Sequence, residues 1–200
     1  MSASPQPIIT PEMYLEMERT AEIRHEYYRG IVYEMSGGSG NHAILIAHLA
    51  ASLVTAMRGK PCSVTVSDMR LRVSPEGLYT YPDAMVFCGE PQYADPRNDT
   101  LLNPIVIIEV VSRSTEAYDR GFKFQQYRLV ESLMDYVLVS QAEPRIEVYS
   151  RQPQGKWLLE EYVGLDAKCR FDSLHCMIAL AEVYEKVIFP PPPVPRTDED

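Results

Sequence analysis

The chain has 200 residues, the length of one ordinary domain, so it can bury a hydrophobic core without disulfides or metal staples. Hydrophobic residues make up 46% of the chain and charged residues 24%, as in soluble globular proteins. The 19 Lys and Arg residues face 28 Asp and Glu residues, and the resulting net charge of -9 argues against a protein that coats nucleic acid through a basic surface. The same charge fits an enzyme that gathers carboxylates around a cation.

Membrane and secretory signals are missing from the sequence. No apolar run approaches the ~18 residues needed to cross a bilayer, and the N-terminus lacks the basic and apolar regions of a secretory signal. Cys62, Cys88, Cys169 and Cys176 lie 26, 81 and 7 positions apart, which is neither a dense disulfide framework nor a Cys-x-x-Cys metal knuckle. We therefore expect a cytoplasmic protein with no membrane partner.

Hydrophobic spacing and turn residues predict alternating helices and strands along most of the chain. The order is helix, hairpin, helix, three strands, helix and strand, followed by a second hairpin and a short helix. We therefore expect an α/β domain in which helices flank one central mixed β-sheet. In chain order the predicted elements span residues 11–19, 25–35, 42–58, 63–73, 79–88, 104–111, 116–130, 135–139, 145–149, 156–163 and 177–187.

Local signals define several of these elements. Thr10 followed by Pro11 is typical of a helix start, and Pro82 interrupts the second strand early. The long helix after the glycine loop has an apolar stripe at helical spacing, made of Ile44, Ala47, His48, Ala51 and Val54. The predicted domains are a flexible N-terminus at 1–9, a single domain at 10–189, and a disordered, proline-rich acidic tail at 190–200.

Glu109 is unusual because it lies inside the most apolar strand of the chain, which reads Pro-Ile-Val-Ile-Ile-Glu-Val-Val over 104–111. Burying an ionised carboxylate without a partner is strongly unfavourable. The fold must therefore place a cation beside Glu109, either a basic side chain or a metal ion. A buried ion pair with an arginine, such as Arg70 or Arg72, would satisfy the same requirement.

Asp83 raises the same question one strand earlier, between Pro82 and the apolar residues 84–87. Carboxylates on adjacent strands can come within about 4–5 Å on one face of a sheet, where they repel unless a cation lies between them. Two carboxylates completed by water molecules are typical of Mg²⁺. For Asp83 taken alone, a turn at the strand end is an equally good interpretation.

The helix that follows Glu109 supplies positive charge. Asp119, Lys123 and Tyr127 are spaced i, i+4, i+8 and so share one stripe of that helix. If the stripe faces the strand, Lys123 can orient a water molecule or offset phosphate charge near Glu109. An exposed ion pair between Asp119 and Lys123 is the simpler interpretation of these two residues alone.

Two other patterns suggest ligand sites but lack part of the required motif. Cys169, His175 and Cys176 form half of a zinc-site pattern with no fourth ligand nearby in the sequence. The segment 37–40 precedes a helix, as in phosphate-binding turns, but carries neither a P-loop nor a dinucleotide-binding motif. We interpret it as a flexible loop that lines the nucleic-acid side of the site.

Four short motifs lie between residues 81 and 127. They are Tyr81-Pro82-Asp83-Ala84, then Ile108-Glu109-Val110-Val111-Ser112, then Ser114-Thr115-Glu116, and finally Tyr118-Asp119-Arg120 with Lys123 and Tyr127. Together they resemble the Uma-two type of restriction endonuclease family, within the PD-(D/E)XK nuclease superfamily. The resemblance covers residues 11–187 and implies a restriction-endonuclease-like αβββαβ core, which agrees with the order of elements given above.

The resemblance also implies roles for individual residues. Asp83 and Glu109 would be the paired acids of a nuclease site, with the backbone carbonyl of Val110 as a further metal ligand. Lys123 would act as the motif lysine, because Val111 stands two residues after Glu109 where the superfamily usually carries it. The implied cofactor is Mg²⁺, or Mn²⁺ in its place, and the implied substrate is DNA. The accessory candidates are Glu26, His42, Asp119 and Tyr127.

These observations leave three functional hypotheses. The first is a metal-dependent DNA endonuclease, favoured by Asp83, Glu109 and Lys123, for which a homodimer would suit the cleavage of two strands. The second is a catalytically silent scaffold of the same fold that binds nucleic acid or a partner protein, favoured by the acidic net charge. The third is a structural oligomer without a ligand, in which Glu109 pairs with an arginine.

Overall fold

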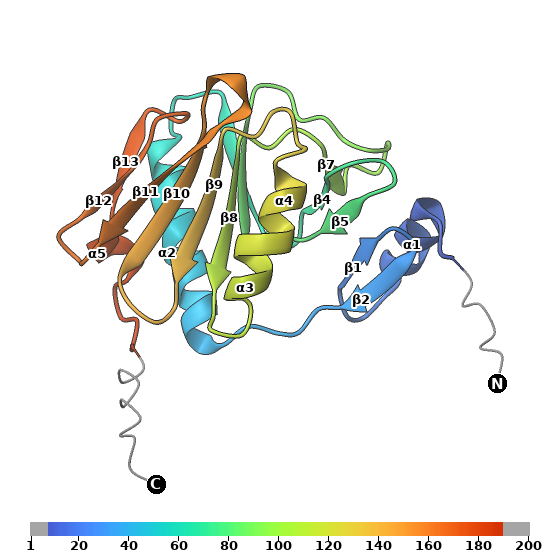
Figure 1. Ribbon diagram of the computed structural model, residues 1–200, viewed down its shortest axis with the longest axis horizontal. Helices are drawn as coiled ribbons and strands as arrows, with labels where there is room; N and C mark the ends of the chain where they lie inside the picture. The colour runs from blue at the N-terminus through green and yellow to red at the C-terminus, as the bar shows by residue number, and fades with distance from the viewer. Residues whose placement is uncertain (1–7, 190–200) are drawn as a thin grey trace, which may run out of the picture.

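The computed structural model describes residues 8–189, and a mixed six-stranded β-sheet forms its centre (Figure 1). The strand order in this sheet is β11-β10-β9-β8-β6-β3. Strands β8 and β9 run parallel, whereas their other neighbours are antiparallel. The strands are β3 (Cys62–Val66), β6 (Ala84–Cys88), β8 (Val106–Val111), β9 (Asp135–Ser140), β10 (Arg145–Arg151) and β11 (Trp157–Val163).

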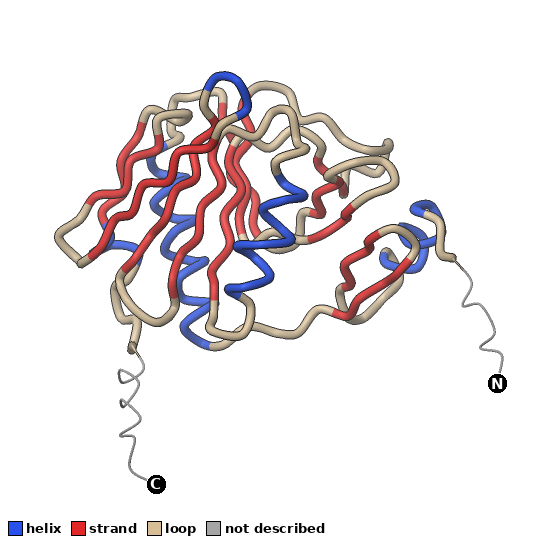
Figure 2. Tube along the Cα trace, in the orientation of Figure 1, coloured by secondary structure: helices blue, strands red, loops and turns tan. Residues whose placement is uncertain are grey.

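A second sheet of five strands lies beside the first and contains the N-terminal hairpin (Figure 2). Its order is β2-β1-β5-β4-β7, and helix α1 (Pro11–Glu18) packs on it through Tyr14. The Tyr14 ring centroid lies 5.2 Å from that of Tyr27. The strands are β1 (His25–Tyr28), β2 (Ile31–Glu34), β4 (Arg70–Arg72), β5 (Leu78–Thr80) and β7 (Thr100–Leu101).

Helices cover both faces of the six-stranded sheet. Helix α2 (Gly40–Ala56) packs on one face, and the other is covered by a continuous helical segment made of α3 (Glu116–Tyr118), a π-helical turn η1 (Asp119–Lys123) and α4 (Phe124–Tyr127). The face of α2 that the sheet buries differs from the apolar stripe seen in the sequence. Leu45, Leu49 and Leu53 are 0% exposed, whereas Val54 is 49% exposed. Because α2 is apolar on nearly every side, residue spacing alone does not define the face that the sheet buries.

The predicted αβββαβ core is confirmed, since α2, β3, β6, β8, the α3–α4 segment and β9 follow one another in that order. The expectation of a single sheet was incomplete. The predicted strand at 63–73 divides into β3 and β4, and the predicted strand at 79–88 divides into β5 and β6, so each contributes to both sheets. The second division falls at Pro82, which has no N–H to continue a ladder.

The C-terminal part differs from the prediction of a helix at 177–187. Residues Cys176–Ala179 form strand β13, which pairs with β12 (Lys168–Phe171), and only Leu180–Val183 form the short helix α5. Burial alternates along β13, where Ile178 is 2% and Met177 is 64% exposed, as expected for a strand with one covered face. The predicted tail at 190–200, and residues 1–7 of the predicted flexible N-terminus, lie outside the described residues.

Cys62 and Cys88 are direct partners on β3 and β6 and form a disulfide. Their separation of 26 positions did not indicate this pairing, which depends on the register of the two strands.

Cys169 is buried in the core, and the half zinc pattern is not completed by other ligands within residues 8–189. Of the described helices, none combines the length and the apolar character needed to cross a bilayer.

Candidate functional site

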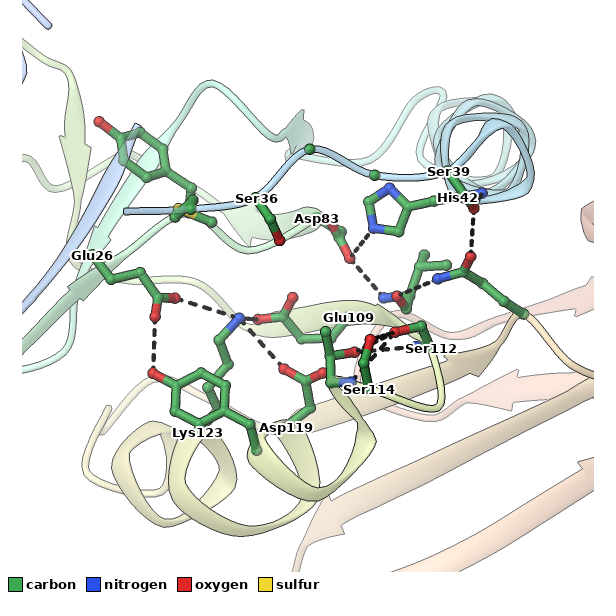
Figure 3. Close-up of a pocket in the computed structure, with 18 of the residues that line it drawn as sticks. Glu26, Ser36, Ser39, His42, Asp83, Glu109, Ser112, Ser114, Asp119 and Lys123 are labelled. Carbon is green, nitrogen blue, oxygen red and sulfur yellow. Dashed lines mark hydrogen bonds and ion pairs between the residues drawn. The ribbon is translucent and has the colours of Figure 1, made fainter. Parts of the chain in front are cut away.

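A polar pocket of about 470 Å³ lies where residues from the two sheets and the α3–α4 segment meet (Figure 3). Its carboxylates outnumber its basic side chains, which are those of Lys123 and His42. Acidic side chains line it from the hairpin, from the connection between the two sheets, from the central sheet and from the helical segment. They are Glu26, Glu34, Asp83, Glu109 and Asp119. This excess of negative charge is the main electrostatic property of the pocket.

Glu109 lies on β8 and is 4% exposed, as its apolar sequence context predicted. Its Oε1 atom accepts hydrogen bonds from Lys123 Nζ at 3.0 Å and from the Tyr127 hydroxyl at 2.7 Å. Burial raises the pKa of Glu109 to about 8, and the charges of Asp83 and Asp119 add to this effect. The single positive charge of Lys123 therefore does not fully offset burial and the neighbouring acids, and the neutral form of Glu109 is favoured.

The alternative of an arginine partner for Glu109 is contradicted. Arg70 is buried, but its guanidinium donates to the Tyr81 hydroxyl at 2.9 Å and to the Thr100 hydroxyl at 3.1 Å. It thus ties the five-stranded sheet to the connection before β6 and does not neutralise Glu109. The third hypothesis, which needed an arginine at Glu109, loses its premise.

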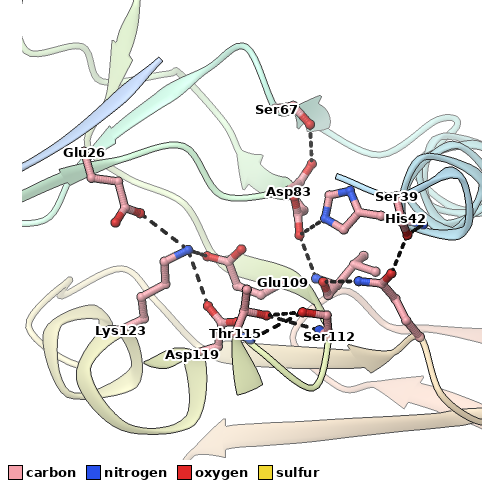
Figure 4. Close-up of polar contacts among 12 residues, drawn as sticks. Glu26, Ser39, His42, Ser67, Asp83, Glu109, Ser112, Thr115, Asp119 and Lys123 are labelled. Atoms are coloured by element: carbon pink, nitrogen blue, oxygen red, sulfur yellow. Dashed lines mark hydrogen bonds and ion pairs between the residues drawn. The ribbon is translucent and has the colours of Figure 1, made fainter. Parts of the chain in front are cut away.

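Asp83 lies in the connection between the sheets, immediately before β6. Strands β6 and β8 are antiparallel and Ala84 pairs with Ile108. The residue before Ala84, which is Asp83, therefore lies opposite the residue after Ile108, which is Glu109. Its Oδ2 atom accepts the backbone N–H of Val110 at 2.7 Å and lies 3.1 Å from His42 Nε2 (Figure 4). The side chain thus reaches across to β8, so the interpretation of Asp83 as a local turn residue does not describe its contacts.

Lys123 reaches the pocket from the π-helical turn η1, together with Asp119. Its Nζ atom lies 3.4 Å from Asp119 Oδ1 and 3.5 Å from Glu26 Oε1, in addition to its bond to Glu109. Lys123 is 7% and Asp119 4% exposed, so the alternative of an exposed surface pair is wrong. Burial works to lower the pKa of Lys123, but the charges of Glu109, Glu26 and Asp119 raise it well above its ordinary value. The carboxylates around Lys123 therefore favour its charged ammonium form.

The accessory candidate Glu26 lies on β1 and is 7% exposed. Besides Lys123, it accepts a hydrogen bond from the Tyr118 hydroxyl at 2.8 Å and another from the Thr80 hydroxyl. Glu26 therefore links the N-terminal hairpin to the helical segment that carries the lysine. Such links hold both parts of the pocket in one geometry.

His42 lies in the first turn of α2, which begins two residues earlier than predicted. The Ser39 hydroxyl caps this helix by accepting the His42 N–H at 3.2 Å. A hydrogen bond to Asp83 raises the pKa of His42 above its usual 6.5. A Cβ atom at Gly38 would lie 2.4 Å from His42 Nδ1, so a side chain there would displace the imidazole. The glycine loop thus allows His42 to approach Asp83.

Comparison with known proteins identifies the family. The model of the Uma2 family, described as "Putative restriction endonuclease", matches residues 11–179. This chain belongs to the Uma2 family. Two uncharacterized proteins from Synechocystis sp. are each 34% identical to it. One alignment covers 94% of this chain and 97% of the relative, and the other covers 84% and 94%.

The fold of this Uma2 chain also matches a solved structure. A protein from Anabaena variabilis, described as a putative nuclease belonging to DUF820, superposes with a TM-score of 0.73. The match covers 90% of this chain and 99% of the other, at 16% sequence identity, and so shows a common fold. The family description points to a nuclease of the restriction-endonuclease type, and the solved structure shows the shared fold.

Two pocket residues of this Uma2 protein were missed in the sequence. Gln141 donates through Nε2 to the Val110 carbonyl at 3.3 Å and accepts the Ser39 hydroxyl at 2.8 Å. It directly follows β9, and since β8 and β9 are parallel their carboxyl ends meet at one edge. The place of Gln141 directly after a buried strand could therefore have marked it as a pocket residue in the sequence. Tyr118, which binds Glu26, gave no signal beyond its place in a motif.

The donor atoms of the Uma2 pocket fit a hard divalent cation. All hydrogen bonds from residues 8–189 to the two side-chain carboxylates go to Oδ2 of Asp83 and Oε1 of Glu109, which leaves Oδ1 and Oε2 available. No three His, Cys, Asp or Glu side chains in this range are grouped as ligands of one ion. Mg²⁺ commonly takes one or two carboxylates and keeps several waters, so two acids and the Val110 carbonyl suit it.

Proposed function

We propose that this Uma2 protein is a metal-dependent endonuclease that hydrolyses DNA phosphodiester bonds. The supporting observation is the joint placement of Asp83, Glu109 and Lys123 in one pocket, although they come from a connection, a central strand and a helical turn. A structural ion pair would need one acid for one lysine. Here carboxylates are in excess and keep oxygen atoms free for a divalent cation, which would in turn offset the charge of a phosphate.

Asp83, Glu109 and the Val110 carbonyl would hold Mg²⁺, with Mn²⁺ as a substitute. When bound, such a cation lowers the pKa of a coordinated water and offsets the negative charge of the scissile phosphate. The Lys123 ammonium and the Tyr127 hydroxyl both bind Oε1 of Glu109, so they orient its carboxylate and leave Oε2 for the ion. His42 and the Val110 N–H orient Asp83 in the same way.

Lys123 acts on the substrate by charge and hydrogen bonding. Because the surrounding carboxylates raise the pKa of Lys123 well above its ordinary value, we assign it the role of a hydrogen-bond donor and not that of a base. Its ammonium can donate to an oxygen of the phosphate or to that water, and so stabilise the charge that develops in the transition state. Preorganised donors of this kind account for a large part of the rate enhancement of many enzymes.

The direct test is incubation of supercoiled and linear DNA with Mg²⁺, Mn²⁺ or a chelator. We expect cleavage with either metal and none with the chelator. Asp83→Ala and Glu109→Ala should each lower the rate by about 10²–10⁴-fold, as for loss of a proton-transfer group. Glu160→Ala, which removes an exposed carboxylate on β11, is the matched control and should cleave normally. Full activity in both pocket variants would rule out this site.

A catalytically silent scaffold is the second candidate, and one observation favours it. The ammonium of Lys123 already lies within 3.5 Å of carboxylates on Glu26, Glu109 and Asp119, and the chain as a whole is acidic. Such a scaffold would bind DNA or a protein without cleaving DNA under any metal condition. The cleavage assay combined with a DNA-binding assay separates the two functions.

The predicted cellular location and oligomeric state of the protein can also be tested. A cytoplasmic location remains a prediction, and the disulfide between Cys62 and Cys88 weighs against it, because disulfides persist mainly in oxidising compartments. Thiol labelling of protein taken directly from cells would show the redox state of this pair. A homodimer, which would place two pockets on one duplex, can be tested by analytical ultracentrifugation.

A further inference from the structure

An aromatic hollow of about 390 Å³ lies beside the acidic pocket and shares two of its residues, Glu26 and Tyr118. Its remaining lining is apolar or aromatic and comes from the hairpin, from β5 and from the π-helical turn. These residues are Tyr28, Tyr33, Leu78 and Phe122. The two hollows are thus neighbours with a common wall.

One face of the five-stranded sheet forms the floor and one side of this aromatic hollow. In the register of the sheet Glu26 pairs with Tyr33, and Tyr28 pairs with Leu78. Since Glu26 and Tyr28 are two residues apart on β1, all four side chains point to the same face. The opposite face of the hairpin packs through Tyr27 against α1, which fixes the sheet in position.

The helical segment forms the other side through stacked aromatic rings. Tyr118 and Phe122 stack with their centroids 5.4 Å apart, and Tyr28 meets Phe122 edge to face at 4.9 Å. The Lys123 ammonium lies 5.7 Å from the centroid of the Tyr118 ring. Tyr118 therefore separates the cation of the acidic pocket from the aromatic hollow.

The aromatic side chains of the hollow remain accessible, and an arginine lies over one of its rings. Tyr33 is 48% and Tyr118 40% exposed, far more than the tyrosines that pack in the cores. The Arg29 guanidinium lies 5.3 Å from the centroid of the Tyr28 ring and makes no ion pair with any residue in the 8–189 range. Accessible aromatic rings beside an arginine are typical of proteins that bind single-stranded nucleic acid.

We propose that this hollow binds an unpaired nucleobase next to the phosphate held in the acidic pocket. A nucleobase is joined to its phosphate by one sugar, which matches two hollows that share the Tyr118 wall. In a duplex each base is paired and stacked, and must leave the helix to enter such a pocket. The preferred substrate is therefore single-stranded or locally unpaired DNA. This inference rests on the proposed nuclease function.

The test measures binding of end-labelled oligonucleotides to the full chain carrying Glu109→Gln, which blocks cleavage. The probes are a single strand, the matching blunt duplex, and single strands with one abasic nucleotide at successive positions. The binding variants are Tyr33→Ala and Tyr33→Phe, because Tyr33 lies on the edge strand β2 and its hydroxyl makes no hydrogen bond to a described residue. Leu159→Ala, at a 44% exposed position on β11, is the control.

We expect the single strand to bind more tightly than the duplex, and one abasic position to weaken its binding. Tyr33→Ala should weaken it by about tenfold, the usual effect of losing one stacking ring. Tyr33→Phe, which keeps the ring, and Leu159→Ala should bind normally. Circular dichroism melting of each variant shows whether an effect comes from unfolding, and 2-aminopurine fluorescence in the single strand reports stacking directly.

Two results would overturn the inference, and they are distinguishable. If the wild-type chain cleaves DNA but duplex and single strand bind equally and Tyr33→Ala changes neither, the base site is wrong and the nuclease function stands. If the wild-type chain neither binds nor cleaves any of these DNAs, the nuclease function fails and the base site with it.

Discussion

Lys123 Nζ lies 3.0 Å from Oε1 of Glu109, although 14 positions separate the two residues in the chain. The lysine approaches from the helical segment that covers β8, and Val111 on β8 itself stays in the core. One ammonium is therefore surrounded by the carboxylates of Glu26, Glu109 and Asp119. Because acids outnumber the base in this cluster, we expect removal of the lysine to lower the stability of the protein and removal of one acid to raise it.

Removing the cation should destabilise the protein strongly. Lys123→Met leaves buried carboxylates without their counter-ion, and loss of one partner of a buried pair typically costs about 3–5 kcal/mol. We expect urea denaturation to show a loss of this size in the free energy of unfolding. Lys168→Met removes an exposed lysine on β12 and serves as the control. Equal stability of both variants would mean that Lys123 does not neutralise this cluster.

Removing one acid should have the opposite effect in metal-free protein. Burial raises the pKa of Glu109 to about 8 from an ordinary value of 4.5, so between these values the folded protein binds more protons than the unfolded chain. The contribution of Glu109 to stability therefore falls as pH rises through this window. Glu109→Gln keeps an oxygen that can accept from Lys123 and Tyr127 but carries no charge to bury.

We expect Glu109→Gln to melt above the wild type at pH 8 in the presence of a chelator. The increase should be about 2–4 °C or more, the shift that 1 kcal/mol produces in a domain of this size. The difference should shrink towards pH 5, where the wild-type carboxyl is protonated, and level off above pH 8. If the variant melts below the wild type at pH 8, the ionised carboxylate of Glu109 does not destabilise the folded protein, and this explanation is wrong.

Adding Mg²⁺ should stabilise the wild-type protein, because an ion that binds only the folded state shifts the equilibrium towards it. At a concentration 100 times the dissociation constant the gain is about 2.7 kcal/mol. Thermal melting with increasing Mg²⁺ measures this gain. It should vanish in Asp83→Ala and persist in Glu160→Ala. A gain that survives in Asp83→Ala would place the ion elsewhere.

The position of the π-helical turn should depend on a pair outside the pocket. Arg120, within η1, donates from its guanidinium to Glu147 on β10, which is 2% exposed. We expect Arg120→Met to cost about 1–3 kcal/mol of stability, since the buried carboxylate loses a hydrogen-bonded partner. Because η1 also carries Asp119 and Lys123, cleavage by the folded variant should slow as well.

The matched control for Arg120→Met is Arg170→Met. Arg170 pairs with Asp172, and both side chains are more than 60% exposed, at 63% and 64%. Exposed ion pairs contribute little, so denaturation and cleavage should remain as in the wild type. A normal rate of cleavage in Arg120→Met at a temperature where it is folded would show that η1 holds its position without this pair.

Much of the fold could be predicted because its signals are local. The apolar run at 104–111 predicted a buried strand, the residues around Arg29-Gly30 predicted a hairpin, and the order of elements predicted the αβββαβ core. The second sheet could not be predicted in this way. Strands β4 and β5 look like continuations of β3 and β6, and only pairing with the hairpin and with β7 assigns them to a sheet of their own.

The sequence by itself determined that Glu109 is buried and that it needs a cation, because strand period and the free energy of desolvation are properties of a short segment. Only the tertiary structure decided which cation it receives and which acids share it. Arg70 is engaged by Tyr81 and Thr100, while the π-helical turn brings Lys123 to Glu109 and the hairpin brings Glu26 to Lys123. Contacts between segments so far apart arise from the packing of two sheets and a helix, which residue spacing does not encode.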